Sequence, residues 1–115
     1  MSPQTSRSPA SRATSVIPKF DEVIHEPMRL RICGLLSSLQ EMQFATIRDT
    51  LGLSDAMCSR HLKTLADCDY VRLTKRQGES NRHMVTWASL TPTGHTALQG
   101  HLAALRAIAA GDMLT

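Results

Sequence analysis

Residues 44–71 read FATIRDTLGLSDAMCSRHLKTLADCDYV, and this stretch decides the fold. Ile47 and Leu51 are four positions apart, so they share one face of a short helix that we predict over 45–51. Gly52 follows directly and ends that helix, because glycine accepts a positive φ without a steric penalty. The stretch therefore opens with a short helix and a sharp turn.

The second helix of the stretch is predicted to begin after Ser54, a good N-cap, with Asp55 in the first turn, where the helix dipole favours a carboxylate. At about 100° per residue, its apolar residues fall on or near one side. That side comprises Cys58, Leu62, Leu65, Ala66 and Cys68. The opposite side is cationic or small and comprises Ala56, Ser59, Arg60, Lys63 and Asp67, with His61 on the shoulder between the two. Such a helix can bury one side and offer the other to a partner.

Helices are also predicted before and after this pair. Pro27 marks the start of the earlier one, because a proline at the first helical position loses no hydrogen bond. Its core-facing stripe comprises Ile32, Leu35, Leu36 and Leu39. A minimal strand is expected over 41–43. Thr91 and Pro92 predict the N-cap and first residue of a last helix over 92–110. Its stripe comprises Leu98, Leu102, Leu105 and Ala109.

A β-hairpin is predicted between the helix pair and the last helix. Residues 70–74 and 83–90 have strand composition. The connecting residues 75–82 are polar and include Gly78, a turn former. This connection is too long for a two-residue turn, so we predict a charged tip.

Charge is unevenly distributed along the chain, although the net charge is only +3. Residues 1–19 carry cations and no acid, and 20–59 are net negative. Residues 60–82 are net positive through Arg60, Lys63, Arg72, Lys75, Arg76 and Arg82. A basic patch in one stretch is an electrostatic footprint for a polyanion. The ordinary alternative is a solvated face of mixed charge, which would be the default without the amphipathic helix beside it.

Length and composition limit the classes of protein to which the chain can belong. A chain of 115 residues has the size of a single domain, and 42% apolar residues suffice for a core. No apolar run is long enough to span a bilayer and no secretory signal is visible, so we expect no membrane partner. Three cysteines without CxxC spacing fit free thiols in a reducing cytoplasm. Residues 1–18 are predicted to be a flexible basic tail, which leaves 19–112 as the domain.

The order of predicted elements (helix, helix, helix, hairpin, helix) resembles that of a winged helix-turn-helix. The motifs resemble those of small bacterial winged-helix regulators related to the MarR and ArsR groups, over about residues 20–110. They are His25–Ile32, Leu51–Asp55, Ser59–Leu65, Tyr70–Val71 and Thr86–Gly94. The resemblance implies an α+β, mostly α fold with a three-helix core, a β-hairpin wing and a C-terminal dimerisation helix. It further implies a homodimeric transcriptional regulator, most simply a repressor, that reads double-stranded DNA with its third helix in the major groove and its wing on the minor groove or phosphates.

Two positions depart from the pattern that this resemblance implies. Met57 stands where relatives tend to carry a polar base-contacting residue, so base readout there would be apolar. Asp69 replaces the glycine that usually precedes the first strand of the wing. Aspartate tolerates the left-handed conformation, so the turn should survive.

DNA contacts are expected from the third helix and from the wing. The residues concerned are Ser54, Asp55, Met57, Ser59, Arg60, His61, Lys63, Thr64, Lys75, Arg76, Asn81 and Arg82. Arg60 is the expected base reader, because arginine bonds bidentately to guanine O6 and N7. The alternative role for Arg60 is that of a surface arginine paired with a phosphate or a carboxylate. Hydroxyl groups and Lys63 are expected on phosphates, which set register rather than sequence.

The remaining contacts are divided between the helix and the wing. His61 either touches a phosphate or packs against the wing. Arg76, Asn81 and Arg82 are expected at the wing tip, on the DNA backbone or in the minor groove. Lys75 lies nearer the hairpin stem, where a solvated strand face is equally consistent with the sequence.

The sequence gives little support for a metal site or a catalytic site. The cysteine pair that metal-sensing ArsR relatives carry at the start of the third helix is missing. The acids and His25 near the first helix match no ligand pattern, nor do His95 and His101 on the last, so no metal or other cofactor is expected. Without a nucleophile–base pair or a phosphate-binding glycine loop, no catalytic residue is expected and the protein is not predicted to be an enzyme.

Three alternatives stay open to different degrees. A winged-helix module for protein association would need a more apolar and aromatic face than 3% aromatic residues supply. RNA binding lacks the paired aromatic rings on which single-stranded bases stack. A metal- or ligand-responsive sensor would have to bind its small-molecule effector at the dimer seam or between the first and last helices.

Overall fold

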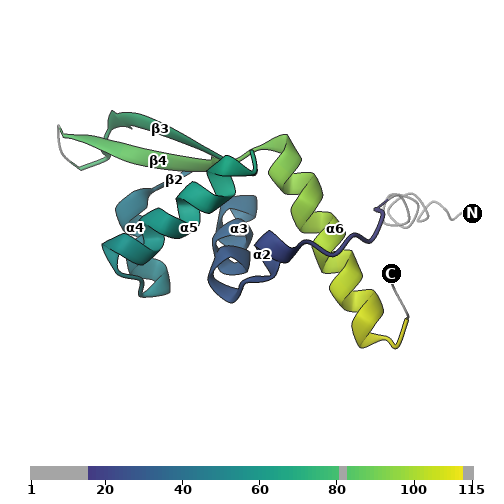
Figure 1. Ribbon diagram of the computed structural model, residues 1–115. Coiled ribbons are helices and arrows are strands. Elements are labelled where there is room, and N and C mark those ends of the chain that lie inside the picture. The colour runs from purple at the N-terminus through teal and green to yellow at the C-terminus, as the bar shows by residue number, and fades with distance from the viewer. Residues whose placement is uncertain (1–15, 81–82, 113–115) are drawn as a thin grey trace, which may run out of the picture.

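The computed structural model describes residues 16–80 and 83–112 (Figure 1). These residues form five helices and a three-stranded antiparallel sheet, which confirms the predicted α+β, mostly helical class. The elements are α2 (Glu22–His25), α3 (Pro27–Ser38), β2 (Met42–Gln43), α4 (Phe44–Leu51), α5 (Asp55–Asp67), β3 (Val71–Gln77), β4 (Met84–Leu90) and α6 (Pro92–Ala109). The earlier helix begins at Pro27 and the last at Pro92, as predicted. The short helix α2 was not predicted.

The sheet has the strand order β2-β4-β3, with helices α3, α4 and α5 on one side of it (Figure 1). Pairing of β3 with β4 runs from Val71 opposite Leu90 to Gln77 opposite Met84. The first strand therefore extends beyond its predicted end at 74, because the cross-strand pairing continues through 75–77, whereas β4 begins at Met84, one residue later than predicted. The hairpin extends beyond the helices at one end of the molecule, and α6 runs away at the other (Figure 1).

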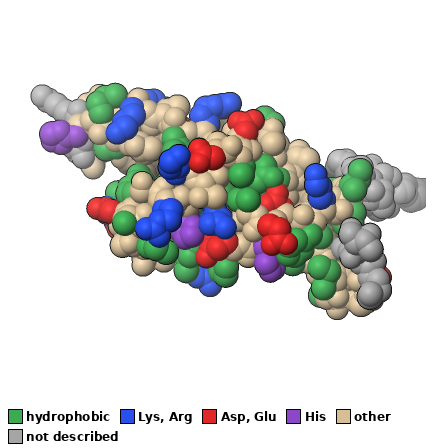
Figure 2. Space-filling model, in the orientation of Figure 1, with side chains coloured by type: hydrophobic (Ala, Val, Ile, Leu, Met, Phe, Trp, Pro, Cys, Tyr) green, Lys and Arg blue, Asp and Glu red, His purple; other side chains and the backbone are tan. Residues whose placement is uncertain are grey.

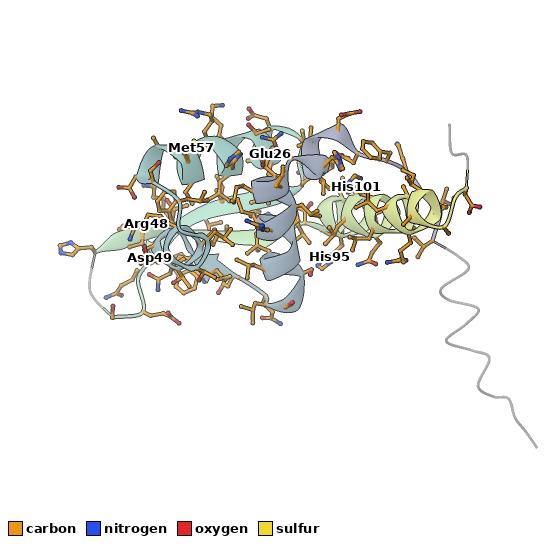
Figure 3. The ribbon with its side chains drawn as sticks, turned by 90° about the horizontal axis from the view of Figure 1, so that it is seen from below. Glu26, Arg48, Asp49, Met57, His95 and His101 are labelled. Carbon is orange, nitrogen blue, oxygen red and sulfur yellow. The ribbon has the colours of Figure 1, made fainter. Side chains whose placement is uncertain are left out.

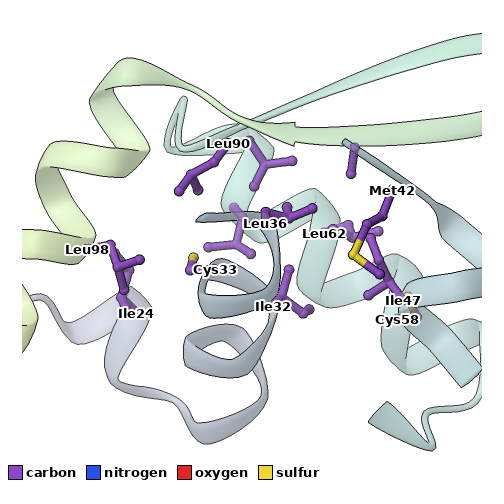
Figure 4. Close-up of a cluster of buried hydrophobic side chains, with 13 residues drawn as sticks. Ile24, Ile32, Cys33, Leu36, Met42, Ile47, Cys58, Leu62, Leu90 and Leu98 are labelled. Atoms are coloured by element: carbon purple, nitrogen blue, oxygen red, sulfur yellow. The ribbon is translucent and has the colours of Figure 1, made fainter. Parts of the chain in front are cut away.

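The core lies between the sheet and the three helices beneath it (Figure 4). Its buried members are Ile24, Ile32, Cys33, Leu36, Met42, Ile47, Cys58, Leu62, Leu65, Val71, Ala88, Leu90 and Leu98. The predicted stripe on α3 was wrong in one respect. Leu39 is 53% exposed, because α3 ends at Ser38 and Leu39 is its C-cap. Cys33 is buried on this helix, close to Ile32 and Leu36.

Helix α6 packs against the body through its first half and extends beyond it (Figure 1). Thr91 caps it, since its Oγ1 accepts a hydrogen bond from the Gly94 N–H at 2.9 Å. Residues 16–20 run along α6, and the Lys19 N–H donates to the Gly100 carbonyl at 2.9 Å. Within the described ranges, none of the helices combines the length and apolar content needed to cross a bilayer.

Candidate nucleic-acid interface

Helices α4 and α5 are joined by a turn that local hydrogen bonds hold in place. Gly52 has φ +67°, and the Leu53 N–H donates to the Arg48 carbonyl at 2.9 Å, so α4 ends in a left-handed cap. Ser54 then starts α5, because its Oγ accepts a hydrogen bond from the Met57 N–H at 3.1 Å. Both caps were predicted, and together they fix the angle at which α5 leaves the turn.

The outer face of α5 is open to solvent in the described part of the chain. Its exposed members are Ser54, Asp55, Met57, Ser59, Arg60 and Lys63, and Thr64 is half-buried. Figure 2 shows Lys and Arg side chains over the hairpin and the helices below it, with carboxylates between them. This face is polar and cationic rather than apolar, as the helical periodicity predicted.

Arg60 stands at the centre of this outer face. Its Nη1 lies 3.4 Å from the Met57 Sδ, a weak contact that leaves the guanidinium available. No carboxylate of the described residues lies within ion-pair distance of Arg60. Lys63 Nζ lies 3.2 Å from Asp67 Oδ2, but both side chains are well exposed, so this pair contributes little and can exchange for a phosphate. Thr64 Oγ1 donates to the Arg60 carbonyl at 3.0 Å and so serves its own helix.

Asp55 is held by an arginine that the sequence did not single out. Arg48 Nη1 lies 2.8 Å from Asp55 Oδ1, and Arg48 Nε lies 2.8 Å from Asp49 Oδ1 (Figure 3). The hydrogen bond from Arg48 lowers the pKa of Asp49, and the two carboxylates raise the pKa of Arg48. The charge of Asp55 is thus offset across the turn, so this residue does not present an unpaired anion to DNA.

His61 is not part of the outer face, which corrects its predicted role. The residue is only 6% exposed, because α3 packs against the side of α5 from which it projects. Its Nδ1 lies 3.2 Å from Arg29 Nη1 and 3.9 Å from Glu26 Oε1. The imidazole therefore contacts the start of α3.

The wing places its cations on two different faces. Lys75 shares one face of β3 with Leu73 and the buried Val71, because side chains two positions apart in a strand point the same way. It therefore leaves the hairpin on the face that the helices cover nearer its base. Arg76 points the other way, and its guanidinium lies 4.4 Å from the Trp87 ring centroid. Arg76 Nη2 also lies 2.8 Å from Glu41 Oε2.

This placement corrects the prediction for the wing tip. Arg76, expected at the tip, is a strand residue of β3 and is occupied by an acid and an aromatic ring, whereas Lys75 lies in the strand, as its expected place nearer the stem implies. Asn81 and Arg82, the other predicted tip contacts, lie outside the described residues. The asymmetry between the two faces could not be deduced from composition, because it depends on strand register.

Two of the three cysteines are buried, and the described residues contain no group of metal ligands. Burial raises the pKa of Cys33 to about 12 and also raises the pKa of Cys58. Cys68 is partly exposed rather than buried as predicted, because α5 ends at Asp67 and Cys68 begins the turn. Over residues 16–80 and 83–112, no three His, Cys, Asp or Glu side chains are grouped so that they could hold a metal ion.

Several solved structures are similar to this chain. A transcriptional regulator homologue from Pyrococcus horikoshii OT3 matches with 20% identity and a TM-score of 0.72, covering 89% of this chain and 94% of that one. The YusO protein from Bacillus subtilis matches with 15% identity and a TM-score of 0.63, covering 93% and 74%. A protein from Enterococcus faecalis V583, assigned to the MarR family of transcriptional regulators, matches with 18% identity and a TM-score of 0.61, covering 96% and 88%.

These likenesses establish the fold, and a sequence match establishes the family. No curated protein matches the chain. A family model described as "Winged helix DNA-binding domain" matches residues 28–109, which include α4, α5, the hairpin and α6. The chain therefore belongs to the winged helix DNA-binding domain family.

Proposed function

We propose that the protein is a sequence-specific, DNA-binding transcriptional regulator that acts as a homodimer. Helix α5 enters the major groove and the hairpin lies on the adjacent backbone or minor groove. The observation that carries this proposal is the exposed Arg60 on the outer face of α5, without an ion-pair partner in the described part of the chain. A regulator of this kind acts most simply as a repressor, because a bound dimer excludes other proteins from the promoter.

Base reading is assigned to Arg60 and Met57. Arg60 supplies the forked donors that match guanine O6 and N7, and Met57, 38% exposed, supplies an apolar contact suited to a thymine methyl group. Ser54, Ser59 and Lys63 are assigned to phosphates. The Ser54 Oγ already accepts a bond from the Met57 N–H, and its hydroxyl proton is still available to a phosphate oxygen.

The wing supplies sequence-independent affinity. Lys75 extends from the helix side of the hairpin and is exposed, so it can reach the backbone that flanks the groove. Asn81 and Arg82 are assigned to the same role at the tip. Arg76 is not included, because it is engaged by Glu41 and Trp87.

The dimer is assigned to α6 and the segment beside it. The far half of α6 carries apolar side chains that the body covers only in part. Leu102 is half-buried against the core, Leu105 is half-buried and Ile108 is 49% exposed. Ile17, beside the same helix, is 78% exposed. Pairing of two such helices would bury these residues and place two α5 helices on one face. Half-sites would then be about one helical turn of DNA apart.

Selection of bound fragments from a random duplex library tests the proposal. We expect a two-fold symmetric consensus, and competition should show the selected duplex bound at least about 1,000-fold more tightly than a scrambled one. Sedimentation of the complex should show two chains per duplex. Equal affinity for the selected and scrambled duplexes would contradict sequence-specific regulation.

A further inference from the structure

Arg29 connects three helices through hydrogen bonds that the DNA-binding proposal does not use. Its Nε donates to the Val23 carbonyl in α2 at 2.7 Å, and its Nη1 donates to His61 Nδ1 in α5 at 3.2 Å. Its own N–H, in the first turn of α3, donates to Glu26 Oε1 at 2.9 Å. The side chain is half-buried, so these bonds are shielded from competing water.

The bond to His61 has a defined polarity. A guanidinium has donors only, so His61 Nδ1 must accept and the proton of the neutral ring lies on Nε2. That Nε2 is buried and has no hydrogen-bond partner among the described residues. Arg29 therefore makes the only hydrogen bond to the His61 ring in the described part of the chain.

The position of α5 depends on this bond because the alternatives are unfavourable. Without Arg29, both nitrogens of a buried imidazole would lack partners, which is strongly disfavoured. The ring could regain partners only by turning toward water or toward Glu26 Oε1, which lies 3.9 Å from Nδ1, and α5 would have to rotate or shift with it. Arg60 directly precedes His61 in α5, so any such movement carries the guanidinium away from its position. Bidentate contacts tolerate displacements of only about 0.5 Å.

We propose that Arg29 is a positioning residue that sets the base selectivity of α5 through His61, without touching DNA. This inference rests on the proposed function. It means that a residue at the start of α3 contributes to the base specificity of the outer face of α5. The bond to the Val23 carbonyl makes α2 part of the same support.

The variants R29M and R31M form a matched pair for the test. Both remove one positive charge from α3, but Arg31 is exposed and makes only a weak contact with Met28 Sδ, at 3.8 Å, among the described residues. The probes are the duplex selected by the wild-type chain and a scrambled duplex of the same composition. We expect R29M to bind the selected duplex at least tenfold more weakly and to bind the scrambled duplex as R31M does. If R29M keeps the wild-type ratio of affinities for the two duplexes, the inference is overturned.

A second variant tests whether Arg29 acts through His61. In R29M/H61L an apolar side chain replaces the buried imidazole, so the unpaired nitrogens are gone and thermal stability should return toward wild type. Because no unpaired ring then displaces α5, selectivity should return together with stability, and this return supports the inference. A stable R29M/H61L that is as unselective as R29M would show that the loss does not act through His61 and would overturn the inference. A wild-type chain that prefers no duplex would instead refute the proposed function, and with it this inference. If the wild type is selective and R29M is equally selective, this inference is refuted and the proposed function is not.

Discussion

His25 Nδ1 and His101 Nε2 lie 3.2 Å apart, and this contact joins α2 to α6. His101 is fully buried, and its Nδ1 accepts a hydrogen bond from the Asp21 N–H at 2.9 Å. The proton of the neutral ring is therefore on Nε2 and points at His25. A second proton on His101 would face the Asp21 N–H, so the cluster favours the neutral ring.

We expect the free energy of unfolding to fall as the pH is lowered through the histidine range. Burial first, and then His25, lower the pKa of His101 from its ordinary value of 6.5, while Asp21 and Glu22 act in the opposite direction. Because the unfolded chain then binds the proton more tightly, the stabilising contribution is complete above 6.5 and is lost as the pH falls toward the folded-state pKa. Denaturant titrations from about pH 8 to about pH 5 measure this.

The control for this prediction is a second histidine of α6. His95 is exposed, and Figure 3 shows it on the opposite side of the helix from His101. H95Q should keep the pH dependence of the wild type, and H101Q should lose the part that His101 supplies. Parallel curves for the wild type and H101Q would rule out His101 as the source.

Tyr70 should titrate at unusually high pH, because its hydroxyl donates to the Asp21 carboxylate. This hydrogen bond, with burial second, raises the pKa of Tyr70 to about 12. Tyr70 is the only tyrosine, so ultraviolet absorbance reports its ionisation directly. In D21N, which retains a side chain able to cap α2, the midpoint should move down toward 10.0. Y70F should cost about 1–2 kcal/mol in denaturant unfolding. A wild-type midpoint equal to that of D21N would show that the carboxylate has no effect.

R60A and K75A should weaken DNA binding in different ways. R60A removes a base-reading fork, so discrimination at one base pair per half-site should fall by about 1–3 kcal/mol. K75A removes a phosphate contact, so its affinity for all sequences should fall alike. The slope of the logarithm of the binding constant against the logarithm of the salt concentration should become shallower by about 0.9 per contact. Competition binding against single-base variants of the selected duplex, repeated over a salt series, separates the two effects. The same salt slope and the same loss on every duplex for both variants would argue against this division of roles.

Local signals predicted much of the fold and the outer face of α5. The starts of α3, α5 and α6 follow from Pro27, Ser54 and Thr91, because a cap acts within one turn of its own helix. The exposure of Arg60 follows from helical periodicity alone. These features need no knowledge of the rest of the chain.

The features that were missed depend on residues far apart in sequence. Helix α2 is stabilised by contacts with α6, and the length of the hairpin depends on strand register. His61 lies on the shoulder of α5 in any helical projection, and only the position of Arg29 shows which way it faces. In the sequence Arg76 likewise has no evident partner, because Glu41 and Trp87 come beside it only when β2 and β4 pair.

Two helical glycines should respond oppositely to alanine. A Cβ on Gly94 would lie 2.2 Å from the Tyr70 carbonyl oxygen, and that oxygen also accepts the Thr91 N–H at 3.0 Å. G94A must therefore push α6 away from the turn that precedes β3 and break this bond, so we expect a loss of about 3 kcal/mol or more. Gly34, inside α3, has nothing within 4 Å of its added Cβ, so G34A should gain about 0.5–1 kcal/mol from the higher helix propensity of alanine. Thermal and denaturant unfolding of both variants measure the difference. G94A as stable as G34A would mean that α6 does not approach Tyr70 so closely, and that the hairpin and α6 meet at a different angle.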